Sequence, residues 1–262
     1  MSKLSKAQIK AHQQACALLQ KETLTYDERW FVLENWQESA THINSAAGAF
    51  FTPIGLAGDF AIEVSGKRIV DLCAGIGMLA FRVANRFAWG ALDEKPEIVC
   101  VEINPDYIAV GRKIVPDAVW VQASVFDLPD LGHFDCAISN PPFGATKRAG
   151  KSPRYTGSAF EYHVIDIASD LADYGVFIIP QASAPFVFSG QRHYEKREGD
   201  NYTAFKNQTG IDLSAGCGID TAYHIGDWRG VAPKTEIVCA DFEELRAKRV
   251  PSQRDMFQVA AE

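Results

Sequence analysis

The sequence lacks several features that would place it in whole classes of protein. Its 262 residues contain no run that approaches the ~18–20 apolar residues needed to span a bilayer. The polar opening MSKLSKAQIK lacks the apolar core of a secretory signal peptide. No internal repeat and no low-complexity linker interrupts the chain. These absences predict one large cytoplasmic domain with no membrane partner.

Metal-binding cysteine patterns and a positive net charge are also missing. The six cysteines include no CxxC pair, and no histidines cluster at zinc spacing. We therefore expect buried thiols in a reducing compartment and no metal site. The net charge of −7 argues against indiscriminate binding of polyanions, so any contact with nucleic acid must come from local basic patches.

What the sequence does contain is an alternation of strand and helix patterns from Arg68 onward. Short β-branched runs lie at 68–73, 97–103, 118–123, 134–139 and 175–180. Helix-compatible stretches lie at 78–88, 105–115 and 158–172. Because nearly continuous apolar strands alternate with helices, we predict a three-layer α/β sandwich with a mostly parallel sheet.

The two ends of the chain depart from this alternation. Residues 3–20 have apolar positions at helical spacing, and Thr25 with Glu28 forms a capping-box pattern for a second helix. Residues 219–226 and 234–242 flank a loop and predict an antiparallel hairpin. The predicted organisation is a helical N-terminal extension over 1–47, a main domain over 48–250 and a tail over 251–262.

A glycine-rich turn follows the first predicted strand. In VDLCAGIGMLA, Gly75 and Gly77 stand between strand and helix, where a missing side chain lets the backbone turn tightly and approach a ligand. With Ala80 they also fit the GxGxxG/A dinucleotide pattern. A simple strand–helix connection and a nicotinamide site are both open alternatives at this point.

Three acids help to separate these alternatives. Asp71, Glu102 and Asp127 fall at the carboxyl ends of three successive predicted strands, where open α/β sheets build ligand sites. A carboxylate beside the turn suits a cationic amine and would repel a pyrophosphate. Any one of the acids could merely cap a helix, but the three together favour a cationic adenosine ligand that carries a ribose.

These residues resemble the Rossmann-like, class I S-adenosylmethionine-dependent methyltransferases over roughly 48–180. The resemblance implies S-adenosylmethionine as cofactor, with Asp71 at its amino group, Glu102 at both ribose hydroxyls and Asp127 at the adenine amino group. Cys73 departs from the family, because many members have a third glycine there. The other positions that the resemblance places beside the cofactor are Phe51, Thr52, Pro53, Ala74, Gly75, Gly77, Ile103, Phe126 and Asn140.

A second motif, Asn140-Pro141-Pro142-Phe143, ends the fourth predicted strand. It matches the motif with which amino-methyltransferases of this family hold a planar amine, which makes these four residues the predicted catalytic set. The Asn140 side-chain oxygen and the Pro141 carbonyl can each accept one amine N–H, so that the nitrogen lone pair develops toward the methyl group. The prolines stiffen the loop, and Phe143 can stack on a base turned out of its helix. A rigid turn that merely ends a strand is the alternative.

The identity of the amine is open at this stage. The motif serves adenine in DNA, adenine or guanine in RNA, and sometimes protein glutamine. AFFTP, at 49–53, resembles an element of DNA adenine methyltransferases and favours adenine-N6 in DNA, although it also fits a helix start. NPPFG followed by a lysine-containing loop resembles ribosomal-RNA adenine methyltransferases. The absence of a Pro-Cys dipeptide argues against methylation of cytosine C5.

Basic residues near the second motif predict the nucleic-acid contacts, although solvated loops have similar compositions. The predicted contacts are Lys147, Arg148, Lys151, Arg154, Arg192, Lys196 and Arg197, with Arg229 and Lys234 as further candidates. Only about 38 residues, 181–218, are left for target recognition. We therefore expect short or loose sequence specificity, or a protein partner that supplies recognition.

Two alternative functions that involve no methyl transfer also fit part of the sequence pattern. A nicotinamide dehydrogenase could use the glycine turn and Glu102, but it leaves Asp71, Asp127 and the 140–143 motif unexplained. A non-catalytic subunit that binds S-adenosylmethionine and acts as an interaction module would keep the sheet and tolerate loss of Asn140.

Overall fold

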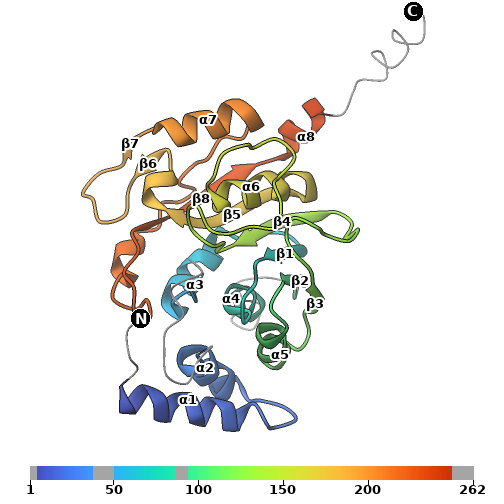
Figure 1. The fold of residues 1–262 in the computed structure, drawn as a ribbon, viewed down its shortest axis with the longest axis vertical. Coiled ribbons are helices and arrows are strands. Elements are labelled where there is room, and N and C mark those ends of the chain that lie inside the picture. The colour runs from blue at the N-terminus through green and yellow to red at the C-terminus, as the bar shows by residue number, and fades with distance from the viewer. Residues whose placement is uncertain (1–4, 38–49, 87–93, 250–262) are drawn as a thin grey trace, which may run out of the picture.

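A six-stranded sheet forms the centre of the computed structural model, which describes residues 5–37, 50–86 and 94–249. The strand order is β3-β2-β1-β4-β5-β8 (Figure 1). The strands are β1 (Arg68–Leu72), β2 (Glu97–Glu102), β3 (Val119–Gln122), β4 (Phe134–Ser139), β5 (Ala172–Pro180) and β8 (Thr235–Asp241). All neighbours pair in parallel except β5 and β8. The mostly parallel sheet predicted from the apolar runs is confirmed.

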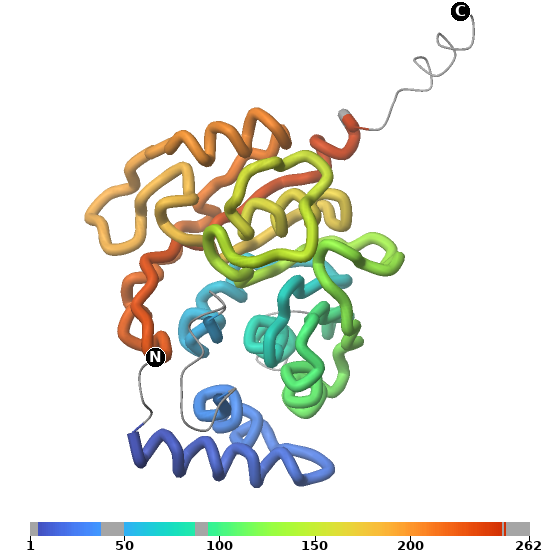
Figure 2. The backbone as a smooth tube through the Cα atoms, in the orientation of Figure 1, coloured from blue at the N-terminus to red at the C-terminus, as the bar shows by residue number. Residues whose placement is uncertain are grey.

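Helices cover both faces of the sheet, as Figure 2 shows in outline. The helices of the main layers are α3 (Ile54–Phe60), α4 (Met78–Arg86), α5 (Pro105–Ile114), α6 (Phe160–Leu171), α7 (Asp200–Thr209) and α8 (Glu243–Arg249). The first three pack in one buried cluster, and α6 and α7 pack in the other. No helix in the described ranges is long and apolar enough to cross a bilayer.

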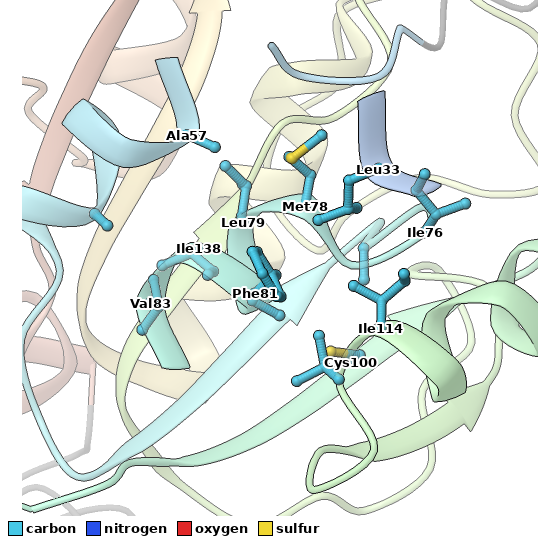
Figure 3. Close-up of a cluster of buried hydrophobic side chains, with 14 of the residues drawn as sticks. Leu33, Ala57, Ile76, Met78, Leu79, Phe81, Val83, Cys100, Ile114 and Ile138 are labelled. Atoms are coloured by element: carbon cyan, nitrogen blue, oxygen red, sulfur yellow. The ribbon is translucent and has the colours of Figure 1, made fainter. Parts of the chain in front are cut away.

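The core is divided in two by the alternation of strand side chains. Ile69 joins the cluster under α4 and α5, while its neighbour Val70 joins the cluster under α6. Ile138 and Ala137 of β4 divide in the same way, because successive strand residues point to opposite faces. Figure 3 shows the first cluster, in which Phe81 of α4 packs above the sheet. Both sheet faces are therefore closed to solvent, and ligand access is left to the strand ends.

The strand order also fixes where a ligand can enter. The chain runs outward from β1 through β2 to β3, then returns to the other side of β1 with β4. The crossovers therefore diverge between β1 and β4. In open parallel sheets such a reversal leaves a crevice at the carboxyl ends of the strands, where ligands bind.

Of the two N-terminal helices, α2 (Tyr26–Asn35) packs against α5, and α1 (Lys6–Leu18) packs against α2. The predicted capping box is present, because the Thr25 hydroxyl accepts the Glu28 N–H and the Glu28 carboxylate accepts the Thr25 N–H. Val32 and Leu33 are fully buried in the same cluster as α4 and α5. The helices thus share the core of the sheet layer. The predicted boundary at residues 47 and 48 lies outside the described residues.

Arg229, which the sequence offered as a nucleic-acid contact, instead secures these helices. Its guanidinium donates to the carbonyls of Leu33 and Trp36 at the end of α2, the latter at 2.6 Å. A cation is favourable at a helix C-terminus. Burial lowers the pKa of Arg229 to about 10. Arg229 therefore holds the end of α2, and a nucleic-acid contact from it stays a prediction.

The antiparallel hairpin was predicted from the segments 219–226 and 234–242, and the first of these segments is not a strand. This segment contains a 3-10 helix, η4 (Thr221–His224), and β8 pairs with β5 instead. The Asp220 carboxylate accepts the N–H of Ala222, which caps the turn. The Thr221 hydroxyl donates to the Thr235 carbonyl. Polar side chains that bond backbone groups thus override the strand pattern.

Candidate active site

A cavity of about 330 Å³ opens at the carboxyl ends of β1, β2 and β4, where the chain order reverses. Its size lies at the lower end of the ~300–1,000 Å³ of small-molecule sites. The predicted residues that line it are Phe51, Cys73, Gly75, Glu102, Ile103, Phe126, Asn140, Pro142, Lys147 and Arg148. Residues of the glycine turn, the second strand end and the 140–143 motif therefore meet around one space.

The glycine turn between β1 and α4 has a left-handed backbone at three positions. Gly75 and Gly77 have φ of 57° and 86°, and Cys73 has φ of 61°. A residue with a Cβ in this region costs roughly 1–2 kcal/mol, which is a physical reason for glycine at that position in the resembling family. Burial raises the pKa of the Cys73 thiol well above its usual range, as do the charges of Glu102 and Asp71. The thiol thus stays neutral and is a poor nucleophile.

Glu102, the last residue of β2, is held by the backbone around it. Its carboxylate accepts the Gly75 N–H at 2.8 Å and the N–H groups of Ile103 and Asn104 at 2.9 Å. The residue is 8% exposed, and burial raises its pKa although the three N–H groups oppose that shift. The carboxylate is therefore fixed against the turn, with lone pairs left for a ligand hydroxyl.

Asn140 follows β4 and is oriented by the AFFTP element. Its Nδ2 donates to the Phe50 carbonyl at 3.0 Å and to the Thr52 hydroxyl at 2.8 Å. A carbonyl only accepts, so these bonds fix which end of the amide faces Phe50. The opposite atom, Oδ1, is buried and has no hydrogen-bond partner among the described residues. Asn140 therefore lines the cavity and carries an acceptor that is buried and unpaired.

The rest of the 140–143 motif is packed into the same strand end. Ser139 is fully buried and its hydroxyl donates to the Leu72 carbonyl, which ties the end of β4 to the start of the glycine turn. Pro142 lines the cavity, while Pro141 is buried and does not. The Phe143 ring lies 6.1 Å from that of Phe50 and packs on the first core cluster.

The segment 144–157, which follows the motif, is anchored to α6 by buried polar side chains. Glu161, 1% exposed, accepts the Gly144 N–H at 2.8 Å. His163, fully buried, accepts the Ser152 N–H through Nδ1 at 3.1 Å. Burial lowers the pKa of His163, which favours the neutral ring that this bond requires. The segment is thus held in one shape over the cavity.

The predicted basic residues fall into three groups. Lys147 and Arg148 line the cavity, and Arg148 also donates to the carbonyls of Gly157 and Ser158. Arg154 forms ion pairs at 2.7 Å with Asp166, which is fully buried, and with Asp170. The remaining predicted cations, which do not line the cavity, are Lys151, Arg192, Lys196 and Arg197.

Several predicted cofactor residues lie outside the cavity lining. Asp71 is 1% exposed, and neither of its carboxylate oxygens has a hydrogen-bond partner among the described residues; burial, followed by the charge of Glu102, raises its pKa well above its usual range. Asp127 is exposed, and only its neighbour Phe126 reaches the cavity. The remaining predicted residues that do not line it are Thr52, Pro53, Ala74 and Gly77. Their contacts with a cofactor stay predictions.

Some lining residues were missed by sequence reasoning. Asn104 and Ser124 come two residues after β2 and β3 end, a position that could have identified them. Tyr107 and Phe160 lie on helices whose apolar patterns do not single them out. The Phe160 ring packs edge-on against Phe126 at 5.3 Å. The aromatic part of the wall thus depends on tertiary packing.

All six cysteines lie within the described residues. All six thiols are free, and Cys100, Cys136 and Cys239 are buried in strands. Within the described ranges, no group of three or more His, Cys, Asp or Glu side chains could hold a metal ion.

Comparisons with known proteins find similarity to solved structures only. No family model matches it, and no curated protein matches it either. A Listeria monocytogenes protein assigned to the class I S-adenosylmethionine-dependent methyltransferases is similar at 14% identity, with a TM-score of 0.55, over 85% of this chain and 69% of that one. A Streptococcus thermophilus type I restriction-modification methyltransferase subunit is similar at 13% identity, with a TM-score of 0.53.

The Streptococcus similarity covers 82% of this chain but 48% of that subunit, so the chain spans about half of its length. At these identities the likeness concerns the fold alone. Together with the sheet order and the reversed last strand, it shows that the chain has the Rossmann-like methyltransferase fold.

Proposed function

We propose that this protein transfers a methyl group from S-adenosylmethionine to the exocyclic amino group of adenine in nucleic acid, with DNA as the favoured substrate. The observation that carries the proposal is the buried, unpartnered Oδ1 of Asn140 at the wall of the cavity. Buried polar atoms rarely lack a partner, and those that do need an explanation. A target amine that donates to Oδ1 supplies one.

The residues around the cavity fit the cofactor. Glu102 offers a fixed carboxylate for ribose hydroxyls, and the Gly75 backbone has no side chain that would block close approach. Ile103 lines the same cavity although it is 61% exposed, and Phe126 lines it as well. Apolar groups of this kind suit the faces of an adenine ring. When bound, S-adenosylmethionine supplies an electrophilic methyl group on a sulfonium.

Asn140 acts on the other reactant. The adenine amine is a poor nucleophile because its lone pair is delocalised into the ring. The amine nitrogen becomes positively charged as it takes the methyl group. A hydrogen bond from the amine to Oδ1 therefore strengthens as methyl transfer proceeds. Phe50 and Thr52 hold Nδ2, which keeps Oδ1 from turning away. The Pro141 carbonyl is the proposed second acceptor. No side chain is needed as a base before attack, because the proton leaves the amine after transfer.

The preference for DNA rests on the AFFTP element. The Thr52 hydroxyl accepts from Nδ2 of Asn140, the proposed catalytic residue, and this contact supports the role that the resemblance to DNA adenine methyltransferases implies for the element. Lys147 and Arg148 supply positive charge at the mouth of the cavity for the phosphates. Adenine in RNA is the rival substrate. The Streptococcus relative is a subunit of a larger system, which is consistent with a partner that supplies target recognition.

Methyl-labelled S-adenosylmethionine with matched DNA and RNA strands, assayed side by side, tests the proposal. We expect label in nucleic acid, with DNA ahead of RNA. Label in RNA alone would move the substrate to RNA and leave the chemistry standing. Tight cofactor binding with no label in either polymer would show a non-catalytic binding subunit, and binding of NAD in preference to S-adenosylmethionine would show a dehydrogenase.

A further inference from the structure

A second cavity, of about 220 Å³, lies at the same edge of the sheet as the first. It opens where β5 ends and β8 begins, and because these strands are antiparallel both ends lie at the carboxyl edge of the parallel strands. Its walls include Gln181 of η3 (Gln181–Ser183), Thr221 of η4, and Lys234 just before β8. The proposed methyl-transfer chemistry uses none of these residues.

Beneath this cavity lies a buried carboxylate whose hydrogen bonds fix the cavity wall. Glu236 is 1% exposed. It accepts the Ser189 hydroxyl at 2.7 Å and the N–H groups of Phe188 and Ser189 at 3.0 Å. The Thr221 hydroxyl donates to the Thr235 carbonyl at 2.6 Å. The hydroxyls of the wall are therefore used within the protein.

Gln181 is the exception, because one end of its amide is unused. Its Nε2 donates to Glu236 at 2.7 Å and to the Ser189 carbonyl at 3.0 Å. A carbonyl can only accept, so the amide cannot be turned the other way. Both N–H groups are engaged, and no described residue donates to Oε1. Gln181 thus has a fixed acceptor that no described residue uses, although, unlike Asn140 Oδ1, this oxygen is not a buried unpartnered atom.

The surroundings of Gln181 suit a nucleotide. Ile225 and Pro233 give the cavity an apolar side, and Lys234 forms no ion pair with a described residue. Tyr223, on the same 3-10 turn as Thr221, is 85% exposed and can stack on a base. An acceptor, an apolar wall, a cation and an exposed ring are the groups that bind the base and phosphate of single-stranded nucleic acid.

Gln181 and Asn140 follow neighbouring strands at the same edge of the sheet. Asn140 directly follows β4, and Gln181 directly follows β5, which pairs with β4 in parallel. Because Ser139 lies opposite Phe177, Gln181 lies roughly 10 Å beyond the level of Asn140 along the strands. One short stretch of nucleic acid along this edge can span both cavities. We infer that the second cavity binds a nucleotide next to the target adenine and prefers a base that carries an exocyclic amine. This inference rests on the proposed function.

The preference follows from what Gln181 offers. Oε1 can only accept, so it pairs with the amine of cytosine and faces an oxygen if the base is thymine. A net hydrogen bond of the usual strength corresponds to about threefold to tenfold in kcat/KM. The effect belongs to substrate binding, and the chemical step and the cofactor affinity stay unchanged.

Single-stranded oligonucleotides with one adenine and a cytosine or a thymine beside it, on either side, provide the test. We expect the wild-type protein to favour cytosine on one side by about threefold to tenfold in kcat/KM. Gln181→Met keeps the length of the side chain and removes the acceptor, so it should abolish this preference. Gln122→Met, at an exposed glutamine of β3 at the far edge of the sheet, should retain it.

Calorimetric titration with S-adenosylmethionine checks that each variant is folded. Methylation without a neighbour preference in the wild-type protein would overturn the inference and leave the proposed function intact. A preference that survives in Gln181→Met would also overturn it. If no oligonucleotide is methylated although the cofactor binds, the proposed function fails, and the inference fails with it.

Discussion

Two walls of the first cavity differ in how far their polar side chains are hydrogen-bonded within the protein. Glu102, at the end of β2, accepts three backbone N–H groups, while Asn140 Oδ1, at the end of β4, accepts none. A carboxylate that is already held by the backbone binds a ligand without having to reorganise. An amide oxygen that is aimed but unpaired gains its partner only when the target amine arrives. Under the proposed function, the first wall would serve cofactor binding and the second the chemical step.

The largest effect should come from the Asn140 wall. Asn140→Ala removes one preorganised acceptor, and such losses lower the rate about 10²–10³-fold. Cofactor affinity should be nearly unchanged, because Oδ1 serves the target amine. Single-turnover kinetics at saturating cofactor measures the rate, with Asn207→Ala at an exposed site on α7 as the matched control. Normal methyl transfer by Asn140→Ala would reduce the motif to a rigid strand end.

The Glu102 wall should show the complementary result. Charge-assisted hydrogen bonds contribute about 1.5–3 kcal/mol, so Glu102→Ala should weaken S-adenosylmethionine binding roughly ten- to a hundredfold. Calorimetry gives the affinity, and circular dichroism confirms that the variant is folded. Unchanged affinity in a folded variant would remove Glu102 from the ribose role.

Lowering the pH should also weaken cofactor binding through Glu102. Burial raises the pKa of Glu102, and the ionised form is the better acceptor for ribose hydroxyls. Cofactor affinity should therefore be complete above this raised pKa and fall as the pH drops through it. Glu102→Gln should bind more weakly and lose this pH dependence. A wild-type slope that persists in Glu102→Gln would assign the titration to another group.

A smaller effect is expected from the cations at the cavity mouth. Lys147→Ala should lower the magnitude of the salt slope of duplex binding by about 0.9, the value of one phosphate contact. Arg154→Ala is the contrasting variant. Arg154 pairs with the buried Asp166, so its loss should reduce stability and leave the salt slope unchanged. Filter binding across a salt series, with thermal unfolding in parallel, distinguishes the two, and equal slope changes would contradict the contrast.

The smallest effect concerns Asp71 in the cofactor-free protein. Its folded pKa is raised, so the native state holds a proton more tightly than the unfolded chain does, and stability declines as the pH rises toward that pKa. Asp71→Asn removes this decline. The variant should therefore gain stability relative to the wild-type protein at pH 8 and little at pH 4. Urea unfolding at both pH values measures this gain, and a variant that loses stability at pH 8 would contradict it.

The elements that local sequence defines were predicted well. The apolar run at 97–103 became β2, and the Thr25–Glu28 capping box began α2. Glu102 and Asn140 were predicted as site residues because Glu102 ends one strand that the pattern identifies and Asn140 directly follows another. The left-handed φ of Cys73 shows why a third glycine is usual there, although the turn forms without it.

What the sequence could not show depends on side-chain partners far along the chain. The pattern of residues 219–226 resembled a strand, but the segment forms η4, and the Thr221 hydroxyl bonds the carbonyl of Thr235. Arg229 resembled a free cation, yet it binds carbonyls almost two hundred residues earlier. Likewise, nothing local indicates that His163 holds the segment after the 140–143 motif. These contacts arise only once the layers are packed.

Identification of the methylated base tests the central claim most directly. The wild-type protein is incubated with S-adenosylmethionine that carries a trideuterated methyl group, and the nucleosides of the DNA and RNA substrates are then separated by mass spectrometry. We predict a mass increase of one labelled methyl group on N6 of adenine. Label on cytosine C5, on a ring nitrogen or on a sugar hydroxyl would contradict the role of Asn140 as the acceptor for an exocyclic amine.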